Sequence, residues 1–170
     1  MTLSDVNAMD REPFVAAFGG IFEDSPWVVR RAWDSRPFAS RRALHQAMTH
    51  QVDSAAREEQ LALLRAHPDL GARARMSAAS TREQEGAGLD QLTPEEYADL
   101  TAWNQTYRDK FGFPFLFAVK GSGKRAIMEA LRQRAGADVD TEFAEALTQV
   151  YRIAWFRLEA AIKAPEEDSP

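Results

Sequence analysis

Apolar residues recur at helical spacing along most of the chain, and short polar breaks separate the segments that carry them. The first candidate helix runs from Asp10 to Phe22, with apolar side chains three and four positions apart. Similar stripes begin near Pro26 and at Ser40, beside residue types that start helices. A fourth stripe ends at His67, because Pro68 disfavours helical geometry in the residue before it. The pattern therefore predicts a run of helices up to Pro68.

A weakly patterned region follows, and its clearest signal is a possible helix start. Ser80 and Glu83 have the S-x-x-E spacing of a capping box, in which each side chain bonds the backbone of the other's turn. This spacing predicts a short helix that begins near Thr81 and runs toward Gly86 or Gly88.

The second half of the chain carries the most regular helix pattern and one exception to it. The helix that starts at Thr93 has a cap, a proline and two glutamates at its beginning, and Gly112 at its end. Further stripes cover about 124–134 and 141–164. Residues 113–119, "FPFLFAV", have the composition of a strand, but the sequence offers no second strand to pair with them. We therefore predict extended chain packed among helices.

These elements predict an all-α fold, a single-domain bundle of roughly seven or eight helices with one short extended segment near residues 113–119. The length of 170 residues suits one domain spanning 1–170, in which 1–9 and 165–170 are expected to be frayed tails. No apolar run approaches the roughly 20 residues that cross a bilayer, and the first residues lack the features of a secretory signal. The expected location is the cytoplasm.

Composition and motifs exclude several classes of function. The net charge of −5 and the pI near 5.3 disfavour nucleic acid and anionic membranes as partners. The chain has no cysteine, so thiolate chemistry and cysteine metal sites are absent. His45 and His50 are five positions apart and point to different helix faces, so no metal is expected. The string "KGSGK" lacks P-loop spacing and is interpreted as a flexible turn.

Three side chains remain as candidates for chemistry, each with a structural alternative. His67, at a helix end, either complements the helix dipole or serves a site. Glu83 either caps its own helix or lines a site with a carboxylate. Arg157 lies beside an apolar stripe and needs a partner there, because burying an unpaired guanidinium is costly. That partner is either a helix carboxylate or a planar anionic ligand.

Taken in order, six strings resemble one family: "FEDSPWV", "RPF", "LLRAHPDLG", "STREQEGAGLD", "LTAWNQTYRDKFGFPFLFAVKG" and "YRIAWFRL". The resemblance covers Phe14 to Leu158 and is to the OHCU decarboxylases, where OHCU is 2-oxo-4-hydroxy-4-carboxy-5-ureidoimidazoline, an intermediate of urate breakdown. It implies an all-helical homodimer and a carbon–carbon lyase that needs no cofactor and releases (S)-allantoin. It also implies a small-molecule ureide as the binding partner.

The resemblance assigns roles to particular residues. It places the family's catalytic histidine and active-site glutamate on His67 and Glu83, with His67 as acid or base. The substrate-contacting positions it implies are Pro68, Ser80, Gln84, Phe115, Leu116, Phe117, Ala118, Val119 and Arg157.

The chemistry of such a reaction agrees with the absence of cofactor motifs. Loss of CO2 leaves an electron pair, and the conjugated C=N and carbonyl of the imidazoline ring accept it, so that the substrate supplies its own electron sink. Two alternatives stay open. One is a non-catalytic helical module or regulator that binds a ureide, against which the acidic charge and the missing helix-turn-helix signal count. The other is a different ureide enzyme such as a hydrolase, against which the missing metal ligands count.

Overall fold

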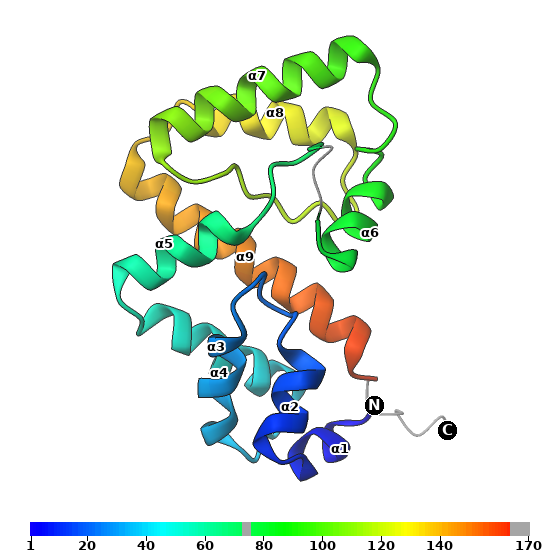
Figure 1. The fold of residues 1–170 in the computed structure, drawn as a ribbon, viewed down its shortest axis with the longest axis vertical. Coiled ribbons are helices and arrows are strands. Elements are labelled where there is room, and N and C mark those ends of the chain that lie inside the picture. Colours follow the sequence, from blue (N-terminus) through cyan, green and yellow to red (C-terminus); the bar gives the residue numbers. More distant parts are fainter. Residues whose placement is uncertain (73–75, 164–170) are drawn as a thin grey trace, which may run out of the picture. The chain divides into compact units, whose positions relative to one another are not determined.

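The structure, a computed structural model, describes residues 1–72 and 76–163. Within these ranges it contains nine α-helices, one short 3-10 helix and no strand, which confirms the all-α prediction (Figure 1). The described residues thus contain one α-helix more than the largest number predicted, which was eight. The elements are α1 Leu3–Ala8, α2 Arg11–Phe18, α3 Pro26–Ala32, η1 Trp33–Ser35, α4 Arg41–Asp53, α5 Arg57–Ala66, α6 Ala78–Gly86, α7 Pro94–Phe111, α8 Lys124–Arg134 and α9 Val139–Ala161.

The chain divides into two compact units. Unit 1 comprises residues 1–63 and 153–170, and unit 2 comprises residues 64–152. The boundaries fall inside α5 and inside α9, so neither boundary coincides with a loop. The assignment of 1–170 to one domain stays a prediction.

Within the first nine residues, Leu3–Ala8 form the helix α1, so the prediction of a frayed tail at 1–9 is wrong. Thr2 and Asp5 form a capping box at the start of α1, which supplies partners to two backbone N–H groups. The side chain of Val6 is fully buried, and the indole of Trp33 donates to the carbonyl of Met9 over 3.2 Å. These contacts hold the segment against the rest of unit 1. The tail predicted at 165–170 lies outside the described residues.

Helices α2, α3 and α4 form the centre of unit 1, where α3 packs against both of the others. As predicted, α3 begins at Pro26 and α4 follows Ser40, whose hydroxyl accepts from the N–H of Ala43. Apolar side chains from all three helices are buried between them, because each helix carries its apolar residues on one face. This core includes Phe14, Phe18, Val28, Val29, Ala32, Leu44, Met48 and Val52.

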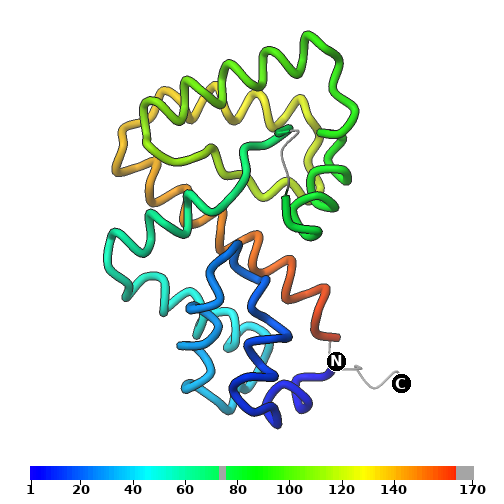
Figure 2. Tube along the Cα trace, viewed as in Figure 1, coloured from blue at the N-terminus to red at the C-terminus, as the bar shows by residue number. Residues whose placement is uncertain are grey.

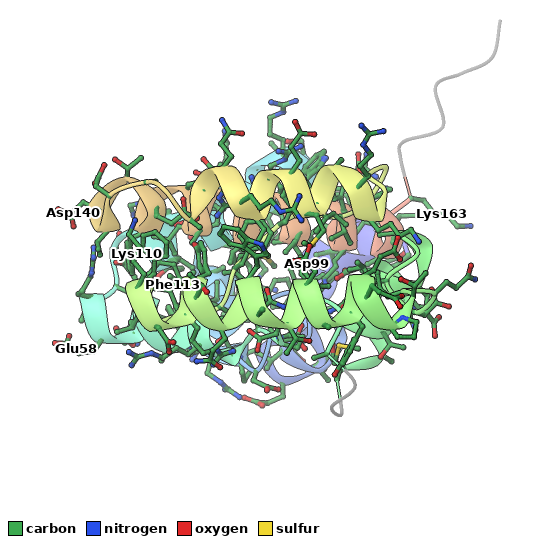
Figure 3. The ribbon with its side chains drawn as sticks, turned by 90° about the horizontal axis from the view of Figure 1, so that it is seen from above. Glu58, Asp99, Lys110, Phe113, Asp140 and Lys163 are labelled. Carbon is green, nitrogen blue, oxygen red and sulfur yellow. The ribbon has the colours of Figure 1, made fainter. Side chains whose placement is uncertain are left out.

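In unit 2, α7 and α8 run side by side (Figures 1 and 3). Two ion pairs join them at their surface, Lys124–Glu96 at 2.7 Å and Arg132–Asp99 at 2.5 Å. The limits of α7 confirm the prediction. Thr93 and Glu96 make a capping box at its start, and Gly112 ends it in the left-handed conformation.

Helix α6 begins three residues earlier than predicted. Its cap is Ser77, whose hydroxyl accepts from the N–H of Ser80 over 3.2 Å. The predicted capping box of Ser80 and Glu83 is therefore wrong, since both residues lie inside the helix. Two serines three positions apart each offer a suitable cap, and only the structure distinguishes them.

Residues 113–119 form neither helix nor strand, which agrees with the predicted extended segment. The Cα trace in Figure 2 leaves the end of α7 and runs on without coiling until α8 begins. Phe113 and Phe115 are buried and meet the ring of Tyr107 edge-on, at centroid distances of 6.0 and 5.4 Å. The segment thus contributes its aromatic residues to the core of unit 2.

Candidate active site

His67 follows the last residue of α5, as the sequence predicts. Its backbone N–H donates to the carbonyl of Leu64, which closes the final turn of the helix. The side chain of His67 is only 6% exposed, whereas Pro68 is half-buried. An imidazole at this position is held by the rigid end of a helix on one side and by the following loop on the other.

Helix α7 fixes the loop that follows Pro68. The guanidinium of Arg108 pairs with the carboxylate of Asp69 over 2.6 Å. One turn earlier, the amide Nδ2 of Asn104 donates to the carbonyl of Leu70 over 2.9 Å. Two consecutive loop residues are therefore tied to one face of one helix.

Gly71 brings the same loop into close contact with α7. Its φ of +72° lies in the left-handed region, which favours glycine. A Cβ atom at this position would lie 2.5 Å from Cδ2 of Leu100 and 3.2 Å from Cδ1 of Leu92. A side chain at this position would strain the backbone and would have to displace Leu100, so "HPDLG" is a structural unit as well as a sequence string.

Helix α6 is joined to this loop through Gln84. The amide Oε1 of Gln84 accepts a hydrogen bond of 2.8 Å from the N–H of Gly71. Ser80 and Gln84 are both buried, and Glu83 is half-buried. Because residues three and four positions apart share a helix face, these three side chains lie on one side of α6. The structure therefore links the predicted α6 residues to the loop that carries His67.

The structural alternative for Glu83 is removed by the start of α6. A capping glutamate stands at the third helical position, and that position belongs to Ser80. The carboxylate of Glu83 is thus not used to cap its own helix.

The predicted substrate-contacting segment 115–119 is held by two polar side chains that the sequence analysis did not identify. The carbonyl of Leu116 accepts from Nη1 of Arg134, on α8, over 2.7 Å. The N–H of Ala118 donates to Oε1 of Gln149, on α9, over 2.9 Å. Phe117 is the one partly exposed residue of the five.

A buried polar network supports Arg134. Its Nε and Nη2 atoms both contact the carboxylate of Glu142, which also accepts from the hydroxyl of Tyr107. Burial of the hydroxyl raises the pKa of Tyr107 above its ordinary value, and the bond to Glu142 adds to this rise. The signal that indicates this network is a polar residue within an apolar stripe, since Glu142 and Gln149 share the inner face of α9.

Arg157 lies in unit 1, on α9, where it forms an ion pair with a carboxylate, although not with a helix carboxylate as the structural alternative predicts. Its Nη1 atom contacts Oε2 of Glu23 over 3.0 Å and the carbonyls of Gly20 and Ile21 over 3.2 and 3.3 Å. The side chains of Arg157 and Glu23 are 8% and 5% exposed. The carboxylate comes from the loop between α2 and α3 rather than from a helix. All the other predicted site residues belong to unit 2.

The described residues contain no group of three or more histidine, aspartate or glutamate side chains placed to hold a metal ion. His45 packs edge-on against the ring of Trp155 at 5.5 Å, and His50 is exposed. Across the same ranges of the chain, no helix combines the length and the apolar character needed to span a membrane.

Comparison with known proteins places this arrangement in a family. A sequence profile of the OHCU decarboxylases matches residues 7–159. The 2-oxo-4-hydroxy-4-carboxy-5-ureidoimidazoline decarboxylase of Haloferax volcanii is 49% identical over 158 residues, which are 93% of this chain and 94% of that protein. The uric acid degradation bifunctional protein PucL of Bacillus subtilis is 46% identical over 157 residues, which are 92% of this chain and 32% of that protein.

Solved structures show the same relationship. A crystal structure of (S)-allantoin synthase aligns with a TM-score of 0.77 at 30% identity, over 95% of this chain and 54% of that chain. A crystal structure of OHCU decarboxylase in the presence of (S)-allantoin aligns with a TM-score of 0.67 over 89% of this chain and 97% of that chain; at 19% identity it shows the fold. The sequence profile and the identity to the relatives together establish that the chain belongs to the OHCU decarboxylase family, a family of carboxy-lyases.

Proposed function

We propose that this chain decarboxylates OHCU to (S)-allantoin without a cofactor, as a step of urate degradation. The observation that carries the proposal is the family match along nearly the whole chain. The relatives supply the substrate and the pathway, because they are OHCU decarboxylases and uric acid degradation proteins.

The substrate's structure sets what the protein must supply. When the C4 carboxylate leaves as CO2, its bonding electrons form a C4=C5 bond, and the electrons of the ring C=N move to nitrogen, which takes a proton. C5 then gains a proton, while the C4 hydroxyl loses its proton and becomes a carbonyl. The carbon that is protonated becomes the stereocentre of allantoin. The protein therefore has to orient the ring and to deliver one proton to one face.

His67 is the proposed acid or base. An imidazole has an ordinary pKa near neutrality and can exchange protons with the substrate at working pH. The burial of His67 and the ties of its loop to α7 support this role, because proton transfer to one face needs a fixed donor.

Glu83 is proposed to orient the imidazole or to accept a ureido N–H from the substrate. Two observations support this proposal: α6 is capped by Ser77, so Glu83 is not part of a capping box, and Glu83 lies on the same side of α6 as Ser80 and Gln84. In the same proposal Ser80, Gln84 and Pro68 contact the ligand, and Phe115 to Val119 offer it their backbone.

Arg157 is proposed to bind an oxygen-rich edge of the substrate. A guanidinium is suited to this because its fork of N–H groups matches planar oxygen acceptors. The family profile extends over both units and includes Arg157. A grip on the departing carboxylate is disfavoured, since it would stabilise the ground state against loss of CO2.

A cytoplasmic location, which is expected from the sequence, and a homodimeric assembly, which the family resemblance implies, are part of the proposal. Sedimentation of the purified chain tests the second: a mass of twice 19.1 kDa supports a homodimer and a mass of 19.1 kDa contradicts it.

The product's handedness tests the proposed activity. Freshly generated OHCU is mixed with the purified chain, and the circular dichroism of the allantoin formed is followed with time. Since spontaneous decay gives both hands, a single-handed signal that appears faster than the uncatalysed reaction supports the proposal. A racemic product at the uncatalysed rate contradicts it, and tight allantoin binding without turnover would indicate a ureide-binding module instead.

A further inference from the structure

We infer that Arg134 and Gln149 are positioning residues that fix the register of the segment from Phe115 to Val119. The inference rests on the proposed function, in which this segment binds the substrate through its backbone. Neither side chain is one of the proposed substrate contacts.

The two contacts fall on alternate residues of the segment. Arg134 holds the carbonyl of Leu116 at 2.7 Å, and Gln149 holds the N–H of Ala118 at 2.9 Å. In extended chain, alternate residues turn their backbone polar groups to the same edge. The rings of Phe115 and Phe117 stack at 6.1 Å, as expected when residues two positions apart share a face.

The residue between the two contacts is therefore turned the other way. In extended geometry the N–H and the carbonyl of Phe117 are expected to face the edge opposite to Arg134 and Gln149, as a donor and an acceptor side by side. That pair matches the amide edge of a ureide ring. A shift of the segment by one residue would turn the N–H and the carbonyl of Phe117 away from the substrate.

Each anchor is itself held. The guanidinium of Arg134 contacts Glu142 through Nε and Nη2, which leaves Nη1 aimed at Leu116, and its plane lies over the ring of Phe115 at 4.6 Å. Tyr107 donates to the same carboxylate, so that the negative charge at its buried position is well compensated.

The amide of Gln149 is oriented by one neighbour. Its Nε2 donates to Oε1 of Glu145, one turn earlier on α9, over 2.7 Å. Because the amide nitrogen is occupied in this way, the oxygen is the atom presented to the N–H of Ala118. The direction of the amide is thus set by a carboxylate outside the segment.

The test compares substitutions that remove or keep the hydrogen bond from Ala118 to position 149 with a control substitution at the surface. Gln149→Met keeps the size of the side chain and removes the acceptor. The swap Gln149→Glu with Glu145→Gln keeps an oxygen acceptor for the N–H of Ala118 and reverses donor and acceptor only in the bond between positions 145 and 149. Arg132→Met is the control, because Arg132 lies on α8 and pairs with Asp99 at the surface.

Kinetics with OHCU and the handedness of the allantoin are measured for each variant, together with the melting temperature. We expect Gln149→Met to raise KM roughly tenfold and to lower the enantiomeric excess, since one lost buried hydrogen bond typically changes binding by about that factor. The swap should return KM toward that of the unsubstituted chain, and Arg132→Met should leave KM unchanged.

The inference is overturned if Gln149→Met has the KM and the enantiomeric excess of Arg132→Met while the unsubstituted chain is active and stereospecific. If the unsubstituted chain gives racemic allantoin at the uncatalysed rate, the proposed function fails and the inference fails with it. Should Gln149→Met be unfolded at the assay temperature, Arg134→Lys provides the test. It keeps the charge beside Glu142 but not the fork, so KM should rise, and an unchanged KM contradicts the inference.

Discussion

The side-chain oxygen of Gln84 accepts a hydrogen bond of 2.8 Å from the backbone N–H of Gly71. This contact joins α6, which carries Ser80 and Glu83, to the loop that follows His67. Two sequence strings that the family resemblance treats separately are thereby parts of one structure. The position of the proposed acid or base depends on the same contacts that position the proposed carboxylate.

Substitution of Gly71 tests the close approach of this loop to α7. Gly71→Ala places a methyl group 2.5 Å from Leu100 at a φ of +72°, whereas Gly88→Ala has a similar φ of +77° and no atom within 4 Å. Both variants carry the backbone strain, so the difference between them isolates the clash. We expect Gly71→Ala to lower the free energy of unfolding by about 1–3 kcal/mol more than Gly88→Ala, measured by urea denaturation. Equal losses would show that the loop moves away from α7 at no cost.

The start of α6 is tested by its cap. Ser77→Ala removes the side-chain acceptor for the N–H of Ser80, and we expect a loss of about 1 kcal/mol in the free energy of unfolding. Thr101→Ala, at an exposed position within α7, serves as the control and should not destabilise the chain. If Ser77→Ala is as stable as the control, Ser77 does not cap α6, and Ser80 becomes the candidate for the cap.

The pair of Arg157 and Glu23 has a structural role that can be separated from the proposed binding role. Glu23→Ala leaves a buried guanidinium without its carboxylate and should cost roughly 3–5 kcal/mol of unfolding free energy. The double variant Glu23→Leu with Arg157→Met should recover most of this loss, because it removes both charges. If Arg157 also binds substrate, the recovered fold has a raised KM; full activity in the double variant would confine Arg157 to a structural role.

The raised pKa of Tyr107 predicts a loss of stability in alkali. A group whose pKa is higher in the folded chain contributes stability below its unfolded pKa, which for tyrosine is near 10, and this contribution falls as the pH rises above that value. Tyr107→Phe should therefore be less stable at neutral pH but lose less stability between neutral and alkaline pH. Denaturation at a series of pH values measures both slopes, and parallel slopes would contradict the prediction.

Local signals in the sequence were sufficient to predict a helix limit where one residue type at one position determines the backbone conformation. Thr93 and Gly112 predict both limits of α7, because a cap and a left-handed glycine act within a single turn. Residues 1–9 were misjudged because the burial of Val6 depends on partners that are distant along the chain.

In the candidate site, too, local features could be predicted from the sequence and contacts between distant residues could not. The need of Arg157 for a partner follows from its place beside an apolar stripe, but the identity of that partner does not, since Glu23 is 134 positions away. Arg134, Glu142 and Gln149 were missed for a related reason. Their contacts with Tyr107, Leu116 and Ala118 form only when the helices pack together.

In the proposed reaction a buried imidazole at position 67 directs the loss of CO2 and the protonation that follows. The most direct measurement is the circular dichroism of allantoin formed from OHCU by His67→Ala, beside the unsubstituted chain and with the helical spectrum of each recorded. We expect this variant to have an unchanged helical spectrum, a rate lower by roughly 10²- to 10⁴-fold and racemic allantoin from spontaneous decay. A folded His67→Ala variant that still forms (S)-allantoin at the full rate would contradict it.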